Sequence, residues 1–192
     1  MADSITNVLL VGVGGQGILL ASEILAEAFM IAGFDVKKSE IHGMSQRGGS
    51  VVSHVRFGEK VYSPVVPEGE GDILFGFELL ETRRYLNLLR PGAKVIVNDF
   101  MIQPPSVLLG NDRYPENLAE EISQRFTDFK LIDGLKIATE VGNQRVANTV
   151  LLGAVSKHLK LDDRVWQKAL QKMVPAKALQ VNLKAFESGR SL

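Results

Sequence analysis

The feature that most constrains this chain is a glycine-dense turn between a short, largely apolar run and an amphipathic helical pattern. The run Asn7–Val11 is followed by Gly-Val-Gly-Gly-Gln-Gly and then by helical periodicity over Gln16–Ile31. Gly12, Gly14 and Gly17 match the G-x-G-x-x-G spacing at a point where a strand should feed a helix. This order predicts a strand–turn–helix unit at the start of an α/β fold.

The glycine turn has two interpretations, one as a ligand site and one as a purely structural turn. Glycines permit a tight turn and let the backbone approach a ligand closely. The free amides and the dipole at a helix start favour a phosphate or a carboxylate. The candidate cofactor-binding residues of the turn are therefore Gly12, Gly14, Gly15, Gln16 and Gly17. The alternative is that the glycines only close a tight strand-to-helix connection.

Short strand-like runs alternate with helical patterns, which predicts a three-layer, Rossmann-like α/β fold with a mostly parallel sheet, helices on both faces and a helical C-terminal part. Several runs are rich in Val, Ile and Leu without alternation, as in strands buried on both faces. The expected strands are Asn7–Val11, Asp35–Ser39, Val51–Phe57, Asp72–Phe77, Lys94–Asn98 and Lys130–Asp133. The expected helices are Gln16–Ile31, Glu78–Leu89 (stopped by Pro91-Gly92), Asn117–Arg125, Leu135–Val141, Asn148–Leu159, Asp163–Met173 and Lys177–Glu187.

Two local patterns refine this prediction. Gly58-Glu-Lys60 is typical of a hairpin turn, so we expect an antiparallel excursion from Val51–Phe57 into Val61–Tyr62. Asp162 is a good helix N-cap, and Leu161 with Trp166 could form a hydrophobic staple around it. The single tryptophan is therefore expected in the core rather than at a ligand.

Length and composition exclude several classes of protein. A chain of 192 residues without a linker or repeat predicts a single domain over 1–192. The 22 basic and 22 acidic residues cancel and are interspersed, which argues against nucleic acid as the main partner. No apolar run approaches the ~20 residues needed to cross a bilayer, and the first residues lack a signal-type segment, so a cytoplasmic protein is expected.

The chain also lacks the residues for a self-contained catalytic or metal centre. It has no cysteine, which excludes a thiolate nucleophile and a cysteine-held iron–sulfur cluster on this chain. His42, His54 and His158 lie far apart in sequence, which argues against a zinc site. No Walker lysine follows the glycines, and no HExxH motif or Ser-His-Asp context is present. These absences favour a partial active site.

A second informative segment, Glu40–Ser50, gathers many special residues in one loop. Arg47 offers a planar fork for a carboxylate or phosphate, and two glycines after it free the backbone to approach another surface. Neutral hydrogen-bonding groups precede the arginine, and a histidine could titrate near neutrality. The candidate catalytic residues are His42, Ser45, Gln46 and Arg47, while Gly48 and Gly49 join the cofactor-binding candidates. The alternative is a glycine-rich surface crossover with a solvated arginine.

Other polar residues support weaker interpretations. Glu40 lies about 20 residues beyond the glycines, where a dinucleotide-binding domain places an acidic residue on the ribose, so a stand-alone NAD(P)-binding protein is an alternative. The proline- and glycine-rich loop Tyr62–Gly71 is typical of binding or interface elements. Interface or loop-shaping roles are expected for Tyr62, Pro64 and Asp72, and capping or solvated roles for Arg145, Asn148 and Lys177.

Together these motifs resemble a known family. Gly12–Gly17, the Ile41-His-Gly-Met-Ser-Gln-Arg-Gly-Gly-Ser50 loop, Val61-Tyr-Ser-Pro64 with Gly69-Glu-Gly-Asp72, and segments of the C-terminal half up to Lys177 carry the resemblance. The chain resembles the small (beta) subunit of the indolepyruvate:ferredoxin oxidoreductases, the gamma subunit or domain of the thiamine-dependent 2-oxoacid:ferredoxin oxidoreductases. The likeness covers nearly the whole chain.

The resemblance implies oxidative decarboxylation of a 2-oxoacid with coenzyme A to an acyl-CoA and carbon dioxide, with electrons passing to ferredoxin. It implies that thiamine diphosphate, Mg and the iron–sulfur clusters belong to a large partner subunit, and that the isolated chain is inactive. This chain would then complete the active site, with Ser45, Gln46 and Arg47 reaching the substrate carboxylate or the coenzyme A phosphates. Pyruvate and 2-oxoglutarate oxidoreductases are the alternative branches.

Overall fold

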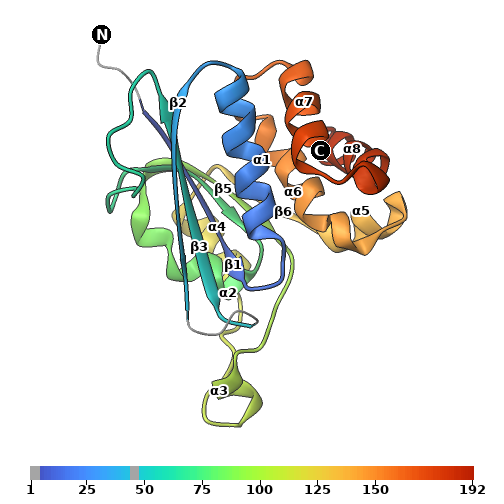
Figure 1. Ribbon diagram of the computed structural model, residues 1–192. Helices are drawn as coiled ribbons and strands as arrows, with labels where there is room; N and C mark the ends of the chain where they lie inside the picture. Colours follow the sequence, from blue (N-terminus) through green and yellow to red (C-terminus); the bar gives the residue numbers. More distant parts are fainter. Residues whose placement is uncertain (1–4, 44–47) are drawn as a thin grey trace.

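The computed structural model describes residues 5–43 and 48–192 and contains one six-stranded sheet in the order β2-β3-β1-β4-β5-β6 (Figure 1). The strands are β1 (Thr6–Val13), β2 (Asp35–His42), β3 (Ser50–Gly58), β4 (Gly71–Gly76), β5 (Leu89–Asn98) and β6 (Phe129–Ile132). Three of the five pairings, from β1 through β4 and β5 to β6, are parallel, whereas β3 is antiparallel to both its neighbours. The predicted α/β class with a mostly parallel sheet is confirmed.

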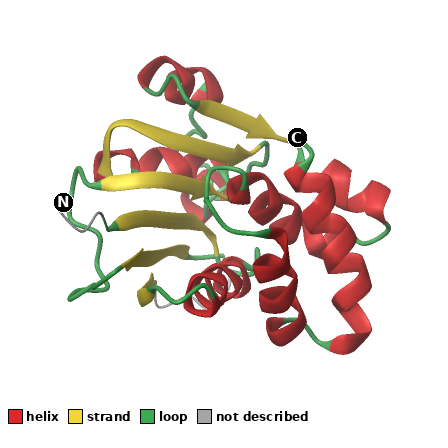
Figure 2. Cartoon of the chain, turned by 90° about the horizontal axis from the view of Figure 1, so that it is seen from above, coloured by secondary structure: helices red, strands yellow, loops and turns green. Residues whose placement is uncertain are grey.

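The helices cover both faces of the sheet, and Figure 2 shows most of them gathered to one side of the strands. They are α1 (Ile18–Ile31), α2 (Leu79–Arg84), α3 (Pro105–Leu108), α4 (Leu118–Arg125), α5 (Gly134–Val141), α6 (Ala147–Ser156), α7 (Asp163–Met173) and α8 (Ala176–Arg190), with 3-10 turns at Leu86–Leu88 and Gln144–Val146. In the described part of the chain, no helix has both the length and the apolar character needed to cross a membrane.

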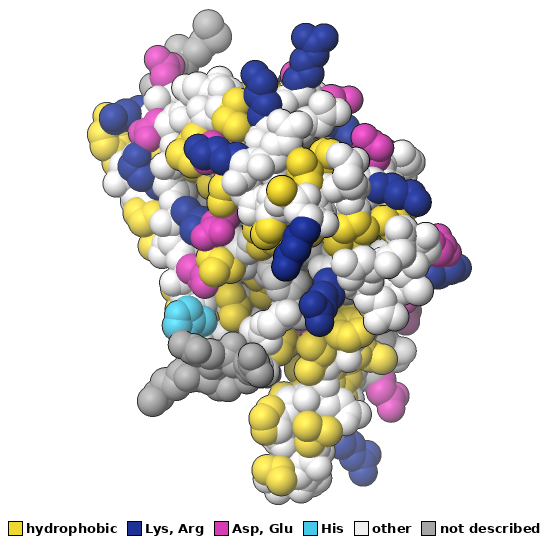
Figure 3. Space-filling view, turned by 45° about the vertical axis from the view of Figure 1, so that its right-hand side comes forward, with side chains coloured by type: hydrophobic (Ala, Val, Ile, Leu, Met, Phe, Trp, Pro, Cys, Tyr) yellow, Lys and Arg dark blue, Asp and Glu magenta, His cyan; other side chains and the backbone are white. Residues whose placement is uncertain are grey.

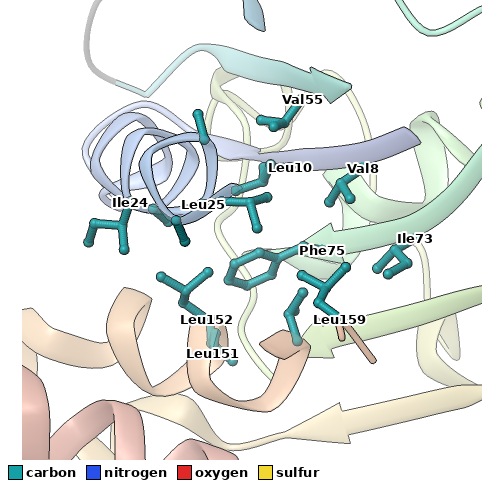
Figure 4. Packing of buried hydrophobic residues seen from close by; sticks show 14 of the residues in the cluster. Val8, Leu10, Ile24, Leu25, Val55, Ile73, Phe75, Leu151, Leu152 and Leu159 are labelled. Atoms are coloured by element: carbon teal, nitrogen blue, oxygen red, sulfur yellow. The ribbon is translucent and has the colours of Figure 1, made fainter. Parts of the chain in front are cut away.

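Alternate residues of β1 face two separate hydrophobic clusters. On one side Leu10 and Phe75 pack with Leu25 of α1 and Leu152 of α6, as Figure 4 shows. On the other side Leu9 packs with residues of α2 and α4. Successive strand side chains point to opposite faces, so a strand covered on both sides must be apolar at every position. This explains the unbroken apolar run that the sequence shows before the glycine turn.

The sheet contains an antiparallel strand, β3, as expected, but Val61–Tyr62 are not its partner because they form no strand. Instead β3 inserts between β1 and β2 and pairs with each along nearly its full length. The chain after β3 is held by side chains rather than by a ladder: the Val61 amide donates to Asp35 Oδ2 at 2.9 Å. The expected hairpin is therefore wrong, because the strand partners available to β3 come from earlier in the sequence.

The helix expected over Glu78–Leu89 is shorter than predicted. α2 ends at Arg84, because Tyr85 leaves helical geometry, and a 3-10 turn leads directly into β5 at Leu89. Leu89 already pairs with Gly71 at the start of the parallel ladder. Pro91-Gly92, taken as a helix stop, lies inside β5 next to a shift of register.

The core position of the tryptophan is confirmed. Trp166 is fully buried, with its ring 6.4 Å from that of Phe29 and 5.4 Å from that of Phe186. The N-cap is confirmed as well, because Asp162 Oδ1 accepts from the Arg164 amide at 2.8 Å. Leu161 packs against the same cluster as Trp166.

One element was not expected. Residues 99–117, between β5 and α4, form a projection that we call the arm, and α3 lies at its end (Figure 1). Its sequence shows only one short apolar stretch between prolines and glycine, too short for helical periodicity to be visible. The arm extends away from the body of the molecule.

Candidate functional site

The glycine turn lies directly after β1 and before α1, as predicted. Gly15 (φ 105°) and Gly17 (φ 82°) adopt left-handed backbone conformations that other residues rarely take. A Cβ on Gly17 would lie 2.7 Å from Asn148 Nδ2, so the glycine allows the start of α6 to pack against the start of α1. Asn148 therefore has a structural role here: it is buried, and its Nδ2 donates to the Gly17 carbonyl at 3.4 Å.

Gln16 spans the crevice between the carboxyl ends of β1 and β4. Its Oε1 accepts from the Val13 amide at 2.8 Å, and its Nε2 donates to the Phe77 carbonyl at 3.0 Å. A Cβ on Gly12 would lie 2.7 Å from Gln16 Oε1, so the first glycine makes room for this side chain. Both polar atoms of the Gln16 side chain are thus used inside the protein.

Asn98, at the end of β5, extends the same arrangement and was missed from the sequence. Its Nδ2 donates to the Phe77 carbonyl at 3.3 Å, and its Oδ1 accepts from the Gly134 amide at 3.0 Å. In doubly wound sheets, ligands bind where the carboxyl ends of neighbouring strands diverge. Here Gln16 and Asn98 occupy that place, and the cavity beside them has a volume of only about 160 Å³. A polar amide at the end of a buried apolar strand was the signal that could have identified Asn98.

The two glycine-rich segments that the sequence singled out are adjacent. The Gly14 amide donates to the Gly49 carbonyl at 2.8 Å, and the Gly48 amide donates to the Gly14 carbonyl at 3.3 Å. This pairing uses the amide of the central glycine, which is therefore not free for a ligand. The candidate residues Ser45, Gln46 and Arg47 lie outside the described residues.

His42 and Glu40 lie on β2, which extends further than expected. His42 pairs with Val51 at the end of the ladder, so the predicted loop begins only after it. The His42 side chain is exposed, and its Nδ1 lies 3.2 Å from the Gly43 carbonyl. Glu40 pairs with Ser53, inside the strand rather than after it. Because β3 separates β2 from β1, Glu40 lies one strand further from the glycine turn than in a dinucleotide-binding domain, an added distance of about 5 Å.

A larger groove lies on the α1 side of the glycine turn. Its volume is about 540 Å³, within the usual range for small-molecule sites. Its lining combines backbone of the turn, apolar side chains and two carboxylates: Gly14, Gly15, Gly17, Ile18, Leu19, Leu20, Glu23, Glu40, His42 and Val51. Glu40 Oε2 is shielded from solvent and has no hydrogen-bond partner among the described residues. No side chain caps the start of α1, so the amides of its first turn remain available to the groove.

The end of the Glu40–Ser50 segment is held by hydrogen bonds around one buried carboxylate, Glu81. Ser50 Oγ donates to Glu81 Oε2 at 2.5 Å and lies 3.2 Å from the Tyr85 hydroxyl, while Arg84 Nη1 donates to Glu81 Oε1 at 2.7 Å. Burial raises the pKa of the Glu81 carboxyl, and the Ser50 hydrogen bond and the Arg84 charge partly oppose that shift. The base of the segment is thus joined to α2.

Of the remaining candidate residues, one makes structural hydrogen bonds and others lie exposed on the surface. Asp72 shapes its loop, because Oδ2 accepts from the Asn7 amide at 2.8 Å and Oδ1 from Arg90 Nε at 2.7 Å. Arg145 and Lys177 are exposed, as is 86% of Tyr62. Within residues 5–43 and 48–192, no group of three or more acidic or histidine side chains could hold a metal ion.

The fold and the joined glycine segments define a Rossmann-like chain in which side chains of the protein itself occupy the usual dinucleotide crevice. The chain belongs to the pyruvate ferredoxin/flavodoxin oxidoreductase family, whose sequence model matches residues 7–192. It is 41% identical over 188 residues to indolepyruvate oxidoreductase subunit IorB of Thermococcus kodakarensis, covering 95% of this chain and 93% of that protein. A similar subunit of Archaeoglobus fulgidus is 36% identical, covering 95% of this chain and 92% of the relative.

Solved structures agree with this assignment. The gamma subunit of a keto/oxoacid ferredoxin oxidoreductase from Geobacter sulfurreducens superposes with a TM-score of 0.71 at 26% identity, covering 97% of this chain and 96% of that one. A 2-oxoglutarate:ferredoxin oxidoreductase from Magnetococcus marinus shares the fold, with a TM-score of 0.74 at 21% identity, over 97% of this chain and 30% of that longer chain. The predicted resemblance is confirmed: this is a small, gamma-type subunit of the oxoacid:ferredoxin oxidoreductases.

Proposed function

We propose that this chain is the small subunit of an aryl-pyruvate enzyme of the indolepyruvate type, and that it completes an active site whose other half lies on a large subunit. That enzyme oxidatively decarboxylates a 2-oxoacid with coenzyme A and passes the electrons to ferredoxin. The choice of substrate class rests on the 41% identity to an indolepyruvate oxidoreductase subunit. Without the large subunit the chain is inactive.

The observation that supports a shared site is the pairing of Gly14 with Gly48 and Gly49. It brings the backbone next to Arg47 to the glycine turn, at the carboxyl edge of the sheet where α/β proteins place their ligands. In this proposal the Arg47 guanidinium binds the carboxylate of the 2-oxoacid or a phosphate of coenzyme A through paired hydrogen bonds. Ser45, Gln46 and His42 add hydrogen bonds around the same ligand.

The proposal assigns the redox cofactors to the large subunit. Thiamine diphosphate with Mg supplies the cleavage of the carbon–carbon bond next to the oxo group, and iron–sulfur clusters accept the electrons. The chain has no cysteine to ligate a cluster. Its own residues bind and orient the substrate and exclude water at the interface.

The experiment is Arg47→Ala in the assembled complex, with Arg164→Ala as the matched control because Arg164 is exposed on the distant helix α7. Loss of a charge-assisted pair should raise the KM for the 2-oxoacid or for coenzyme A by about 10- to 100-fold, which corresponds to about 1.4–2.8 kcal/mol. The Arg164→Ala complex should match the wild type. Kinetics unchanged by Arg47→Ala would remove Arg47 from the site.

The glycine turn is proposed to hold the phosphates of coenzyme A or to pack against the large subunit. The free amides at the start of α1 and the adjoining groove support the first possibility, whereas the carboxylates of Glu23 and Glu40 repel an anion. Calorimetry with coenzyme A, on the chain alone and on the complex, distinguishes phosphate binding from packing against the large subunit. Heat of binding in neither sample would leave Gly12, Gly14, Gly15 and Gly17 with a structural role.

The substrate itself is tested with a panel of 2-oxoacids under anaerobic conditions. Indolepyruvate and phenylpyruvate should support coenzyme A-dependent reduction of an electron-acceptor dye by the complex. Preference for pyruvate or 2-oxoglutarate would instead place the enzyme with relatives such as the pyruvate/ketoisovalerate gamma subunit of Pyrococcus abyssi, at 31% identity. Tight NAD binding by the isolated 192-residue domain would favour the stand-alone alternative.

A further inference from the structure

The arm carries three of the most exposed large apolar side chains among residues 5–43 and 48–192, and the proposed site uses none of them. Leu108 and Leu109 at its end are 68% and 74% exposed, and Met101 near its base is 62% exposed. Figure 3 shows hydrophobic side chains covering this projection below the body of the molecule. The twelve residues 100–111 contain no Asp, Glu, Lys or Arg. Depletion of charge around exposed large apolar residues is the compositional signal of an interface centre.

The arm has a defined conformation at its end. The α3 turn is closed by hydrogen bonds from the Leu108 amide to the Pro104 carbonyl at 3.1 Å and from the Leu109 amide to the Pro105 carbonyl at 3.0 Å. The Asn111 amide closes the turn on the Ser106 carbonyl at 2.9 Å. The two leucines are therefore presented on an ordered helical turn.

One buried carboxylate, Glu78, binds both segments at the base of the arm, where the Leu79 amide also donates to the Phe100 carbonyl at 3.1 Å. The Glu78 side chain is fully buried, and Oε1 accepts from the Ile102 amide at 3.1 Å and from the Tyr114 hydroxyl. Oε2 accepts from the Glu81 amide at 2.7 Å and caps α2. Both chain segments of the arm are thus joined to the same helix end, and burial together with the Glu78 contact raises the pKa of Tyr114. An element ordered before binding loses less conformational entropy when it binds.

From this geometry we infer that the arm is a docking element that inserts Leu108 and Leu109 into an apolar cleft of the large partner subunit. The inference rests on the proposed function for the identity of that partner. The arm follows β5 at the same carboxyl edge as the glycine turn, so a subunit that shares the site there also reaches the arm.

The shape of the arm argues against a second copy of this chain as its occupant. A two-fold contact would set one convex end against another, with only the α3 side chains touching, whereas specific interfaces use about 20–30 residues a side. Insertion into the 540 Å³ groove of a second copy would be a head-to-tail contact, which leads to rings or open chains. A separate subunit with a concave apolar surface would match both the convex shape of the arm and its apolar side chains.

The test uses the full chain with the double substitution L108Q/L109Q and its large partner subunit. The matched control is M30Q/I31Q, which changes two neighbouring apolar residues, 50% and 36% exposed, at the C-terminal end of α1. Removal of two apolar side chains from an interface centre should raise the Kd for the large subunit about 30-fold or more. The control should change it less than about 2-fold. At saturating variant chain, kcat should return to the wild-type value, because the arm docks and does not contact substrate.

Each outcome has a distinct meaning. Wild-type affinity of L108Q/L109Q for a large subunit that binds the wild-type chain would overturn the docking role and leave the proposed function intact. Failure of the wild-type chain to bind any thiamine-binding large chain would overturn the proposed function, and the docking role with it. Self-association of the wild-type chain that L108Q/L109Q abolishes would assign the arm to a second copy instead. Equal thermal unfolding of all three chains excludes misfolding as the cause.

Discussion

Two long segments of this protein, the loop Tyr62–Gly71 and the arm, are held by buried polar side chains in different ways. The loop is bound along its length: Arg56 Nη1 donates to the carbonyls of Ser63 and Val65, both at 3.0 Å, and His54 Nδ1 accepts from the Val66 amide at 3.1 Å. The arm is held at its base, by Glu78 and by a hydrogen bond from the Leu79 amide to the Phe100 carbonyl, and its apolar end lies in solvent.

The difference separates a loop that contributes to stability from a segment that exposes an apolar surface. A segment whose backbone is bound by core side chains loses stability when those contacts are removed. A segment held only at its base keeps a free surface, and substitutions at its end change binding rather than folding. The sequence had singled out the loop as an interface candidate because of its prolines and glycines, and that role stays a prediction, since Tyr62 is 86% exposed; the arm, which the sequence did not single out, exposes Leu108 and Leu109 as well.

The largest effect is expected for Arg56→Met. This change leaves the Ser63 and Val65 carbonyls and Asn7 Oδ1, which accepts from Arg56 Nε at 2.7 Å, without their donor. Because Arg56 is buried, the free energy of unfolding should fall by about 3 kcal/mol, measured by urea unfolding. Arg56→Lys keeps the charge but not the planar guanidinium, so its free energy of unfolding should lie between those of the wild type and Arg56→Met. A loss below about 1 kcal/mol would show that the loop is not bound in this way.

A smaller loss of stability is expected for Glu78→Ala, at about 2 kcal/mol, because the cap of α2 and both contacts to the arm disappear together. This variant should also bind the large subunit more weakly, since the arm is no longer ordered beforehand. Glu78→Gln keeps an acceptor for the Ile102 amide and serves as the milder control. If Glu78→Ala lost stability but bound the large subunit with wild-type affinity, the contacts at the base of the arm would not contribute to docking.

A pH-dependent effect is expected at the loop through His54. Burial, and next the charge of Arg56, lower the pKa of His54 in the folded protein. The neutral ring is therefore favoured by folding, and its contribution is complete above about pH 6.5 and decreases as the pH falls towards the lowered pKa. His54→Asn keeps an acceptor for the Val66 amide and removes the titration. Between pH 7.5 and 5.5, urea unfolding should show a wild-type loss exceeding that of the variant by up to about 1.4 kcal/mol per pH unit. Parallel pH profiles would contradict this account.

The smallest effect on stability is expected at the end of the arm. L108Q/L109Q should change the free energy of unfolding by no more than about 0.5 kcal/mol, because both side chains already lie in solvent. Thermal and urea unfolding of the chain alone measure this. A large destabilisation would mean that the arm packs on the body in solution, and the contrast with the loop would then disappear.

The sequence by itself determined the α/β class, the position of the glycine turn and most helices of the C-terminal half. These features depend on local periodicity and capping, which a short stretch of residues contains completely. Asp162 as an N-cap and Trp166 in the core are examples. The motifs were specific enough to identify the oxoacid:ferredoxin oxidoreductase family before any fold was known.

Only the tertiary structure decided which polar groups are free for a ligand or partner. Gln16, read as cofactor-binding, has both side-chain polar atoms bonded inside the protein, and Asn98 joins it from a strand 82 positions later in the chain. The insertion of β3 between β1 and β2, the binding of the Tyr62–Gly71 loop by Arg56 and the exposure of the arm likewise depend on contacts between distant segments. Such contacts follow from packing around a common core, which local sequence patterns do not encode.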